Sequence, residues 1–153
     1  MQCPVCNSPG YLAIRIKLVR ETATLPEYKT SGAVGADLRA VEGYRIEPGV
    51  TRHVPTGIAI ELPAGFEGQV RPRSGMSSKG LIFPNSIGTI DQDYRGEIWV
   101  PLYNLGPEYQ IVQPGDRIAQ LVISPVAQAK FIPSQNLSST GRGENGFGST
   151  GVR

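Results

Sequence analysis

Short runs of alternating apolar and polar residues recur along most of this chain, and turn residues separate them. In residues 11–19 (YLAIRIKLV), apolar side chains occupy every second position from Leu12 to Leu18, with two basic residues between them. A period of two residues is typical of a half-buried β-strand. Turns rich in Pro and Gly divide the further runs, at residues 35–40, 44–46, 50–54, 56–62, 66–73, 109–112 and 117–123. Turn signals spaced by roughly 8–15 residues indicate an all-β sandwich or barrel.

The segment 85–104 (NSIGTIDQDYRGEIWVPLYN) joins a polar turn to an apolar run. The turn holds Asp91, Asp93 and Tyr94, and the run over residues 98–103 is apolar on both of its faces. A strand of this kind is expected to be covered on both sides. We therefore expect a polar turn fixed by a doubly buried strand, which suits a functional site, although an acidic hairpin turn before a core strand fits the same pattern.

The two ends of the chain and one internal stretch depart from the strand pattern. Ser74 could cap a single helical turn that ends at Gly80. Residues 134–153 lose apolar periodicity and are rich in Ser, Gly, Asn and Thr, as in a mobile arm. We expect a loose tail over residues 1–10, one β domain over 11–133 and a mobile C-terminal arm over 134–153.

Charge and hydropathy exclude several classes of partner. The net charge is +2, and the 15 basic residues are scattered rather than clustered, so a nucleic-acid partner is not indicated. The sequence contains no run of about 18 apolar residues, so we expect no membrane span. No secretory signal pattern is visible. A soluble protein of the cytoplasm is therefore expected.

The two cysteines, Cys3 and Cys6, form one CxxC pair near the N-terminus. A structural zinc site usually has four ligands, and the only histidine of the chain is His53. One chain cannot complete such a site from Cys and His alone. An unstructured reduced terminus or a remnant, a metal shared between subunits and a redox pair all stay open.

Two stretches carry donor groups that suit phosphate. The first is Arg73-Ser74-Gly75, between a predicted strand and the predicted helical turn, where free backbone N–H groups, a guanidinium and a hydroxyl come together. The second is the Gly-rich end of the arm, residues 141–151, whose backbone can approach an anion closely. An ordinary capped turn and a disordered tail are the alternatives for these two stretches.

The acidic turn suits general-base chemistry better than nucleophilic catalysis. No histidine or cysteine lies near Asp91 in the sequence, and no serine elbow is present. An aspartate among polar turn groups can activate a water molecule. The chain also contains no GxxxxGK[ST] stretch, so a P-loop enzyme is excluded.

Five stretches carry these features in a fixed order along the chain. They are residues 35–38 (GADL), 72–76 (PRSGM), 88–97 (GTIDQDYRGE), 115–121 (GDRIAQL) and 142–151 (RGENGFGSTG). Together they closely resemble the motifs of the trimeric dUTP pyrophosphatases (dUTPases), over nearly the whole chain from about Leu12 to Gly151. The resemblance implies a jelly-roll β fold with one short helix and a flexible arm. It also implies a homotrimer with active sites between subunits, which hydrolyses dUTP to dUMP and pyrophosphate with Mg²⁺ on the triphosphate.

The resemblance also assigns roles to residues of the central turn. Asp91 would be the general base, and Tyr94 would pack under the deoxyribose and leave no room for a 2′-hydroxyl. Uracil would be read by Asn85 and by the backbone around Thr89, Ile90 and Trp99. A carbonyl and an amino group at the 4-position differ in hydrogen-bonding polarity, so such backbone groups can separate uracil from cytosine.

The remaining roles fall on other parts of the chain. The residues that would hold the phosphates are Arg73, Ser74, Gly75 and Gln120, and Asp37 would meet the magnesium ion through water. The arm would close over a neighbour's site with Arg142, Phe147, Gly148, Ser149 and Thr150, with Phe147 on the uracil. Asn145 stands where the family tail usually has glycine, which would matter if that position needs a positive φ.

Two rival functions share this resemblance. The related dCTP deaminases, including bifunctional forms, carry a glutamate base where this chain has Pro101, and proline cannot move a proton. A non-catalytic nucleotide-binding regulator on the same fold is the second rival. The base, sugar-packing and arm residues are all present here, which favours an enzyme.

Overall fold

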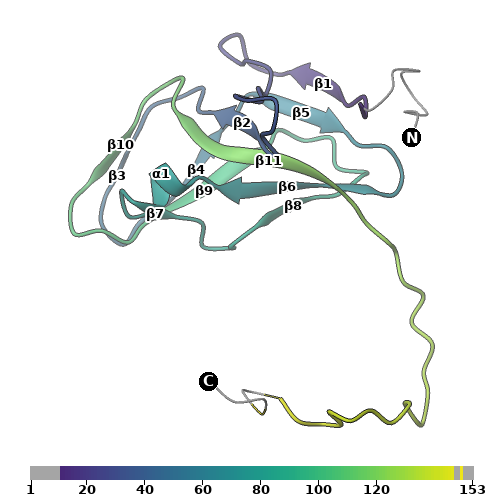
Figure 1. Ribbon diagram of the computed structural model, residues 1–153. Helices are drawn as coiled ribbons and strands as arrows, with labels where there is room; N and C mark the ends of the chain where they lie inside the picture. The colour runs from purple at the N-terminus through teal and green to yellow at the C-terminus, as the bar shows by residue number, and fades with distance from the viewer. Residues whose placement is uncertain (1–10, 147–148, 150–153) are drawn as a thin grey trace.

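The body of the molecule is a stack of antiparallel β-sheets with a long C-terminal arm (Figure 1). The computed structural model describes residues 11–146 and Ser149, so the CxxC segment lies outside the described residues. The largest sheet has the order β2 (Ala36–Arg39), β11 (Arg117–Pro125), β6 (Phe66–Pro72) and β8 (Gly88–Ile90). The second sheet has the order β4 (Thr51–Pro55), β9 (Trp99–Asn104) and β7 (Leu81–Ile82).

Two smaller sheets and a helical turn complete the body. The two-stranded sheets join β1 (Arg15–Leu18) to β5 (Ile58–Glu61), and β10 (Gln110–Val112) to β3 (Tyr44–Ile46). The helical turn α1 (Ser74–Ser77) follows β6 directly. The prediction of an all-β protein with one short helix is thus confirmed. In the part of the chain that the structure describes, no helix is long enough or apolar enough to cross a membrane.

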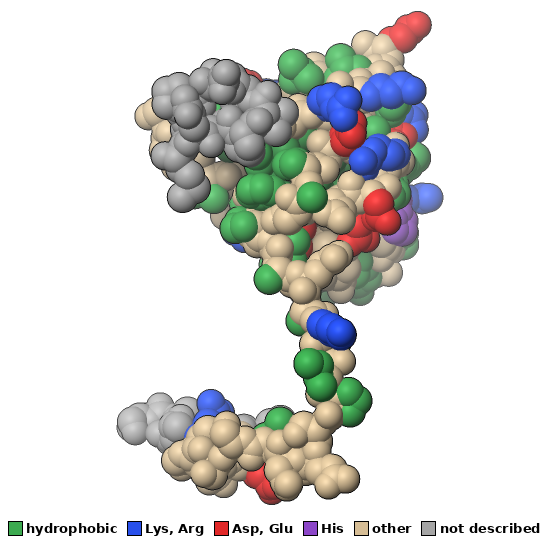
Figure 2. All heavy atoms as spheres, turned by 90° about the vertical axis from the view of Figure 1, so that its right-hand side faces the viewer, with side chains coloured by type: hydrophobic (Ala, Val, Ile, Leu, Met, Phe, Trp, Pro, Cys, Tyr) green, Lys and Arg blue, Asp and Glu red, His purple; other side chains and the backbone are tan. Residues whose placement is uncertain are grey.

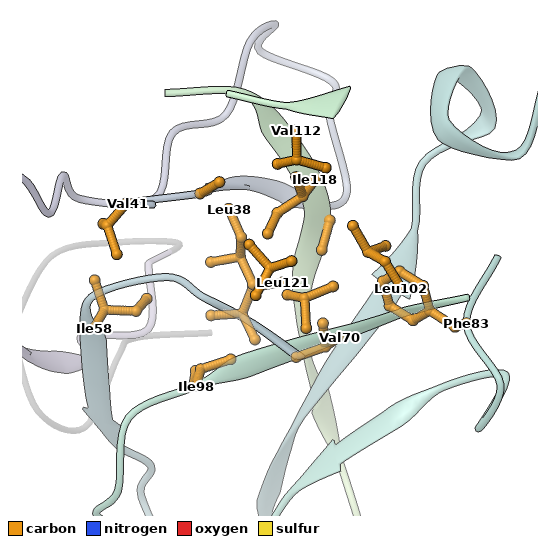
Figure 3. Packing of buried hydrophobic residues seen from close by; sticks show 14 of the residues in the cluster. Leu38, Val41, Ile58, Val70, Phe83, Ile98, Leu102, Val112, Ile118 and Leu121 are labelled. Atoms are coloured by element: carbon orange, nitrogen blue, oxygen red, sulfur yellow. The ribbon is translucent and has the colours of Figure 1, made fainter. Parts of the chain in front are cut away.

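One continuous apolar core lies between the sheets. Its members come from strands far apart in the sequence, and Figure 3 shows them pointing toward one another: Leu38, Ile58, Val70, Ile98, Leu102, Ile118 and Leu121 among others. Each fully buried aliphatic side chain contributes about 1.5–3 kcal/mol relative to an exposed one. This packing fixes the strands whose ends carry the polar residues discussed below.

The buried asparagine at the end of β9 ties the end of β3 and the loop between β9 and β10 to this core. Asn104 is fully buried, and its Nδ2 donates to the carbonyl oxygens of Ile46 (2.9 Å) and Glu108 (2.8 Å). Its Oδ1 accepts the N–H of Gly106 at 2.9 Å. A buried amide is stable only when its hydrogen bonds are made, and these are. Among the described residues, no buried side-chain nitrogen or oxygen lacks a partner.

Two details of the expected elements are wrong, and a third is met only in part. The first strand begins at Arg15 instead of residue 11, and Leu18 is exposed because β1 pairs only with β5. Ser74 does not cap α1, since Arg73 occupies that position and makes no side-chain capping bond. The cover expected on both faces of β9 is present on one face within a single chain, where Val100 and Leu102 are fully buried, while Trp99 on the other face is 42% exposed. Cover of that second face by a neighbouring subunit stays a prediction.

Candidate active site

The turn between β8 and β9 presents Asp91 at an exposed edge of the largest sheet. β8 pairs with β6 through Gly68 opposite Ile90 and Val70 opposite Gly88, so the strand before Asp91 is held by a regular ladder. The N–H of Tyr94 then donates to the carbonyl oxygen of Asp91 at 3.1 Å and closes a tight turn. The Asp91 carboxylate itself has no hydrogen-bond or ion-pair partner among the described residues. It is therefore free to accept a proton from water.

The hydroxyl end of the Tyr94 side chain is held by two contacts. Its hydroxyl donates to the carbonyl oxygen of Glu97 at 2.9 Å. Its ring lies on Gly96, where an added Cβ would sit 2.3 Å from the hydroxyl oxygen and 2.5 Å from Cζ. Only glycine permits this contact. The ring still keeps 43% of its surface exposed, so it offers a rigid aromatic surface to a ligand.

The backbone of Trp99 faces an unpaired part of the edge of β9. The N–H of Asn104 donates to the carbonyl oxygen of Val50, and the N–H of Thr56 donates to the carbonyl oxygen of Ile98. The even-numbered residues along β9 therefore direct their backbone groups toward β4. The odd-numbered residues face the opposite side, where β7 pairs only with Tyr103 and Asn104. Trp99 therefore has a donor and an acceptor directed away from β4 and beyond the end of β7. Pro101 also faces this side, where its missing N–H costs no bond to β4.

Asn85 lies in the loop before β8, and Thr89 and Ile90 lie in β8 itself, directly before Asp91. Asn85 is exposed, and an added Cβ at Gly88 would lie 3.6 Å from its Nδ2, so the amide sits beside the start of β8. Ser86, next to it, has a φ of 62° and is the one described non-glycine residue in the left-handed region. Such a conformation is sterically costly and fixes how the loop leaves Asn85.

A second group of predicted residues gathers around the buried carboxylate of Asp37. Asp37 is only 3% exposed, and Oδ1 lies 3.0 Å from Nε of Arg73 while Oδ2 lies 3.0 Å from a terminal nitrogen of Arg117. Nε2 of Gln120 approaches Oδ1 at 3.4 Å. Pairing of β11 with β2 places Gln120 opposite Asp37. Gly35 leaves room for the Gln120 side chain, because a Cβ added at Gly35 would lie 2.9 Å from Gln120 Cβ. The sequence motifs predicted three of these four residues, and Arg117 was missed although it lies within the GDRIAQL stretch.

The start of α1 lies next to Arg73. Arg73 has an extended backbone (φ −94°, ψ 140°), and its carbonyl oxygen accepts the N–H groups of Met76 and Ser77. The N–H groups of Ser74 and Gly75 come first in the helix and have no partner within it. Both residues are exposed, so hydroxyl and amide donors stand beside the guanidinium of Arg73.

The two groups lie at opposite ends of β6. Asp91 follows β8 and lies next to the start of β6, where Ile90 is opposite Gly68, whereas Arg73 follows the other end of β6. About six residues of extended strand separate the position of Asp91 along β6 from that of Arg73, which is roughly 20 Å at about 3.3 Å per residue. After the parts of the ligand that the sequence predicts for them, we call the turn around Asp91, Tyr94 and Trp99 the nucleoside half, and the cluster of Asp37, Arg73, Arg117 and Gln120 the phosphate half. One chain does not bring the two halves together.

The described part of the arm leads away from both halves of its own chain. Residues 125–145 are all exposed, and Figures 1 and 2 show the chain leaving the body after β11. Nε of Arg142 donates to the carbonyl oxygen of Asn145 at 2.9 Å. The φ of Asn145 is not positive, so Asn145 does not adopt the left-handed conformation that would favour glycine. The predicted contacts of Phe147, Gly148 and Thr150 lie outside the described residues, and the N–H of Ser149 donates to the carbonyl oxygen of Gly146.

Comparison with known proteins decides the family. The dUTPase family model matches residues 21–151 of the chain. A deoxyuridine 5′-triphosphate nucleotidohydrolase of Anaeromyxobacter sp. is 56% identical over 128 residues, which are 83% of this chain and 87% of the relative. The corresponding protein of Hydrogenobaculum sp. is 50% identical over 93% of this chain and its own full length. The chain belongs to the dUTPase family.

Solved dUTPase structures share the fold. The Staphylococcus bacteriophage 80alpha dUTPase with dUPNHPP superposes with a TM-score of 0.82 at 28% identity, over 92% of this chain and 99% of that one. A mutant dUTPase from phage phi11 of S. aureus, described for its coordination of a structural Mg(II) ion, has a TM-score of 0.75 at 24% identity, over 81% and 97% of the two chains. The dUTPase fold thus covers most of this chain and nearly all of each phage protein.

The donor set of this dUTPase fits a magnesium ion that is held mainly by substrate and water. No group of three or more His, Cys, Asp or Glu residues gathers into a metal cage within the described part of the chain. Both oxygens of Asp37 already face guanidinium groups. Magnesium commonly keeps several waters and binds substrate phosphates, so contact with Asp37 through water is compatible with this arrangement.

Proposed function

We propose that this member of the dUTPase family hydrolyses dUTP to dUMP and pyrophosphate in active sites assembled between the subunits of a homotrimer. The separation of the nucleoside half from the phosphate half, roughly 20 Å on one chain, supports this most strongly. A general base must lie within hydrogen-bonding reach of the water that attacks the α-phosphorus. The phosphate ligands must lie equally near, so the second half has to come from another copy. The reaction would keep uracil out of DNA and supply dUMP for thymidylate synthesis.

Asp91 acts as the general base. Its carboxylate is exposed and unpaired, and it takes a proton from a water molecule as that water attacks the α-phosphorus. The bond from the α-phosphorus to the bridging oxygen breaks in line, and pyrophosphate leaves. Asp93, two residues later in the same turn, has a structural role.

The nucleoside half selects the sugar and the base. The ring of Tyr94, fixed by Gly96 and the Glu97 carbonyl, packs under the deoxyribose where a 2′-hydroxyl would need space. Asn85 and the backbone of Thr89, Ile90 and Trp99 read the uracil edge. A site built to pair with the 4-carbonyl of uracil rejects the amino group of cytosine, because buried polar groups would be left unpaired.

The phosphate half holds the triphosphate. Asp37 orients Arg73 and Arg117, and Arg73, Ser74, Gly75 and Gln120 donate to phosphate oxygens. A magnesium ion on the triphosphate would supply positive charge that offsets the charge of the leaving pyrophosphate. Asp37 would hold that ion through water.

The arm completes the site from a neighbouring subunit. Its exposed course away from the body leaves it free to reach another copy. Arg142, Ser149 and Thr150 bind the terminal phosphate, and Phe147 covers the uracil with Gly148 beside it. Closure excludes water other than the attacking molecule.

Product analysis tests this function directly. The purified protein is incubated with dUTP, dCTP and dTTP, with magnesium and with EDTA, and the products are separated by ion-exchange chromatography. We expect dUMP and pyrophosphate from dUTP only, with loss of most turnover in EDTA. Release of ammonia from dCTP at a comparable rate would show a deaminase instead, and binding of dUTP without turnover would show a regulator.

A further inference from the structure

A charged cluster outside the proposed contacts lies directly behind the nucleoside half. The guanidinium of Arg20 makes a two-pronged contact with Glu97, with Nε to Oε1 at 2.7 Å and a terminal nitrogen to Oε2 at 2.9 Å. Arg20 also pairs with Glu42, whose other oxygen accepts the hydroxyl of Tyr44 at 2.6 Å. Planar, two-pronged pairing of this kind fixes both position and angle.

Glu97 is held from a second side by the rigid backbone at Gly57. The N–H of Gly57 donates to Oε1 of Glu97 at 2.9 Å. Gly57 has a φ of +72°, and an added Cβ would lie 2.5 Å from Cβ of Ala23 and 2.9 Å from the Val41 side chain. This backbone cannot shift without disturbing the core, so the Glu97 carboxylate has a defined location while Arg20 neutralises it.

Glu97 and Arg20 also contact two residues of the nucleoside half, Tyr94 and Trp99. The carbonyl oxygen of Glu97 accepts the hydroxyl of Tyr94 at 2.9 Å. The guanidinium carbon of Arg20 lies 5.3 Å from the ring centre of Trp99, whose backbone faces the open edge of β9. No contact with the nucleotide is proposed for Arg20, so it would act through Glu97 and Trp99.

We infer that Arg20 is a positioning residue for sugar selectivity, which sets the preference for 2′-deoxynucleoside over ribonucleoside triphosphates by fixing Glu97 and, through it, Tyr94. The inference rests on the proposed packing of Tyr94 under the deoxyribose. The Glu97 side chain is only 14% exposed. Without Arg20 its carboxylate would keep only the neutral N–H of Gly57 as a donor, so the carboxylate turns toward water. The Glu97 carbonyl moves with it, and the Tyr94 ring gains the freedom that a 2′-hydroxyl needs. The hydrogen bond with Glu97 raises the pKa of Arg20 above its ordinary value, so the guanidinium stays charged at every working pH.

The kinetic test compares Arg20→Met and Arg20→Lys with a matched control, Arg15→Met. Arg15 pairs with Glu61 on the surface and belongs to neither half of the site. The measured quantity is the ratio of kcat/KM for dUTP to kcat/KM for UTP. We expect this ratio to fall about tenfold in Arg20→Met, less in Arg20→Lys, and not at all in Arg15→Met. Equal losses for the two nucleotides, with the ratio kept within about twofold, would mean a merely structural role and overturn the inference.

A charge-matched double variant gives a rescue test. Glu97→Gln removes the charge that Arg20→Met leaves unpaired and keeps an oxygen for the Gly57 N–H. The double variant should therefore recover most of the dUTP preference that Arg20→Met loses. Additive losses instead of recovery would contradict coupling through Glu97.

Trp99 gives a readout that needs no activity, because it is the only tryptophan of the chain. Removing the guanidinium above its ring should increase acrylamide quenching of its fluorescence in Arg20→Met but not in Arg15→Met. Unchanged quenching would show that the stacking is absent in solution and would overturn the inference. Tyr94→Ala separates the two proposals: if it leaves the dUTP to UTP ratio unchanged, both the role of Tyr94 and the inference fail. If Tyr94→Ala lowers the ratio and Arg20→Met does not, only the inference fails.

Discussion

The nucleoside half and the phosphate half are held in place by different forces. Tyr94 is fixed by contact with Gly96 and by a neutral hydrogen bond to the Glu97 carbonyl. Arg73 is fixed by a buried carboxylate, Asp37, that also holds Arg117. Shape and backbone geometry hold Tyr94 directly, and charge acts on it only through the Arg20–Glu97 pair, whereas charge holds Arg73 directly. The first arrangement should therefore respond most to small changes in volume, and the second most to charge and salt.

Both halves are prepared in advance on one chain, and our proposal is that neither is a complete site by itself. Each sits on a rigid sheet, which keeps its donors and acceptors in place before the nucleotide arrives. The arm differs from both, because residues 127–145 are exposed and run away from the body. The division suggests that specificity is set within a chain, and that catalysis depends on how chains meet.

The largest expected effect concerns the nucleoside half. Asp91→Asn should lower kcat for dUTP by about a thousandfold, because an amide cannot take a proton from water. Binding of a non-hydrolysable dUTP analogue, measured by calorimetry, should stay within a fewfold of the wild-type value. Asp93→Asn is the control, and near-normal turnover is expected there. Near-normal turnover of Asp91→Asn would remove the catalytic role from this half.

Removal of the arm should have the next largest effect. Deleting residues 141–153 should lower turnover by about a hundredfold, because the terminal phosphate and the base lose their cover. Light scattering after gel filtration should still show a trimer, since the described part of this segment lies away from the body. Full activity of the shortened chain would exclude the arm from the site.

A smaller effect is expected where charge fixes the phosphate half. Asp37→Asn leaves two guanidinium groups facing a neutral amide, so KM for dUTP should rise about tenfold and become more sensitive to salt. Stability in a urea titration should fall by about 2 kcal/mol, because hydrogen bonds to a charged partner are lost. Glu27→Gln, at an exposed residue paired with Lys29 beside Asp37, should change neither value. If Asp37→Asn kept the wild-type KM, the phosphate half would not depend on charge for its arrangement.

The sequence predicted the strands of the largest sheet better than its edges. Alternation over residues 66–73 and 117–123 was long enough to indicate β6 and β11, whereas β8 has three residues, Gly88–Ile90, and no usable period. Ser74 resembles a capping residue, but Arg73 has the extended backbone that begins the helix. The local sequence contains no information on this choice, because the ion pair of Arg73 with Asp37 depends on strands far apart in the chain.

The site shows a similar division. Asp91, Tyr94 and Arg73 were predicted because their motifs are contiguous in sequence. Arg117 was missed, since its role depends on Asp37 reaching it across the pairing of β2 and β11. The two-faced apolar pattern of β9 predicted a doubly covered strand, and within one chain only the face of Val100 and Leu102 is covered. A neighbouring subunit on the face of Trp99 remains our prediction.

The central claim, that each site combines halves from different chains, can be tested by mixing two inactive variants. Asp91→Asn has a defective nucleoside half and an intact phosphate half, and Arg73→Ala has the reverse. Unfolded together in equal amounts and refolded, they should recover about a quarter of the wild-type turnover, because random assembly gives both intact halves at that fraction of sites. A mixture of Asp91→Asn with Tyr94→Ala, both in the same half, should gain less. If the first mixture stays as inactive as its components while still forming mixed oligomers, each site is built from one chain and the account is wrong.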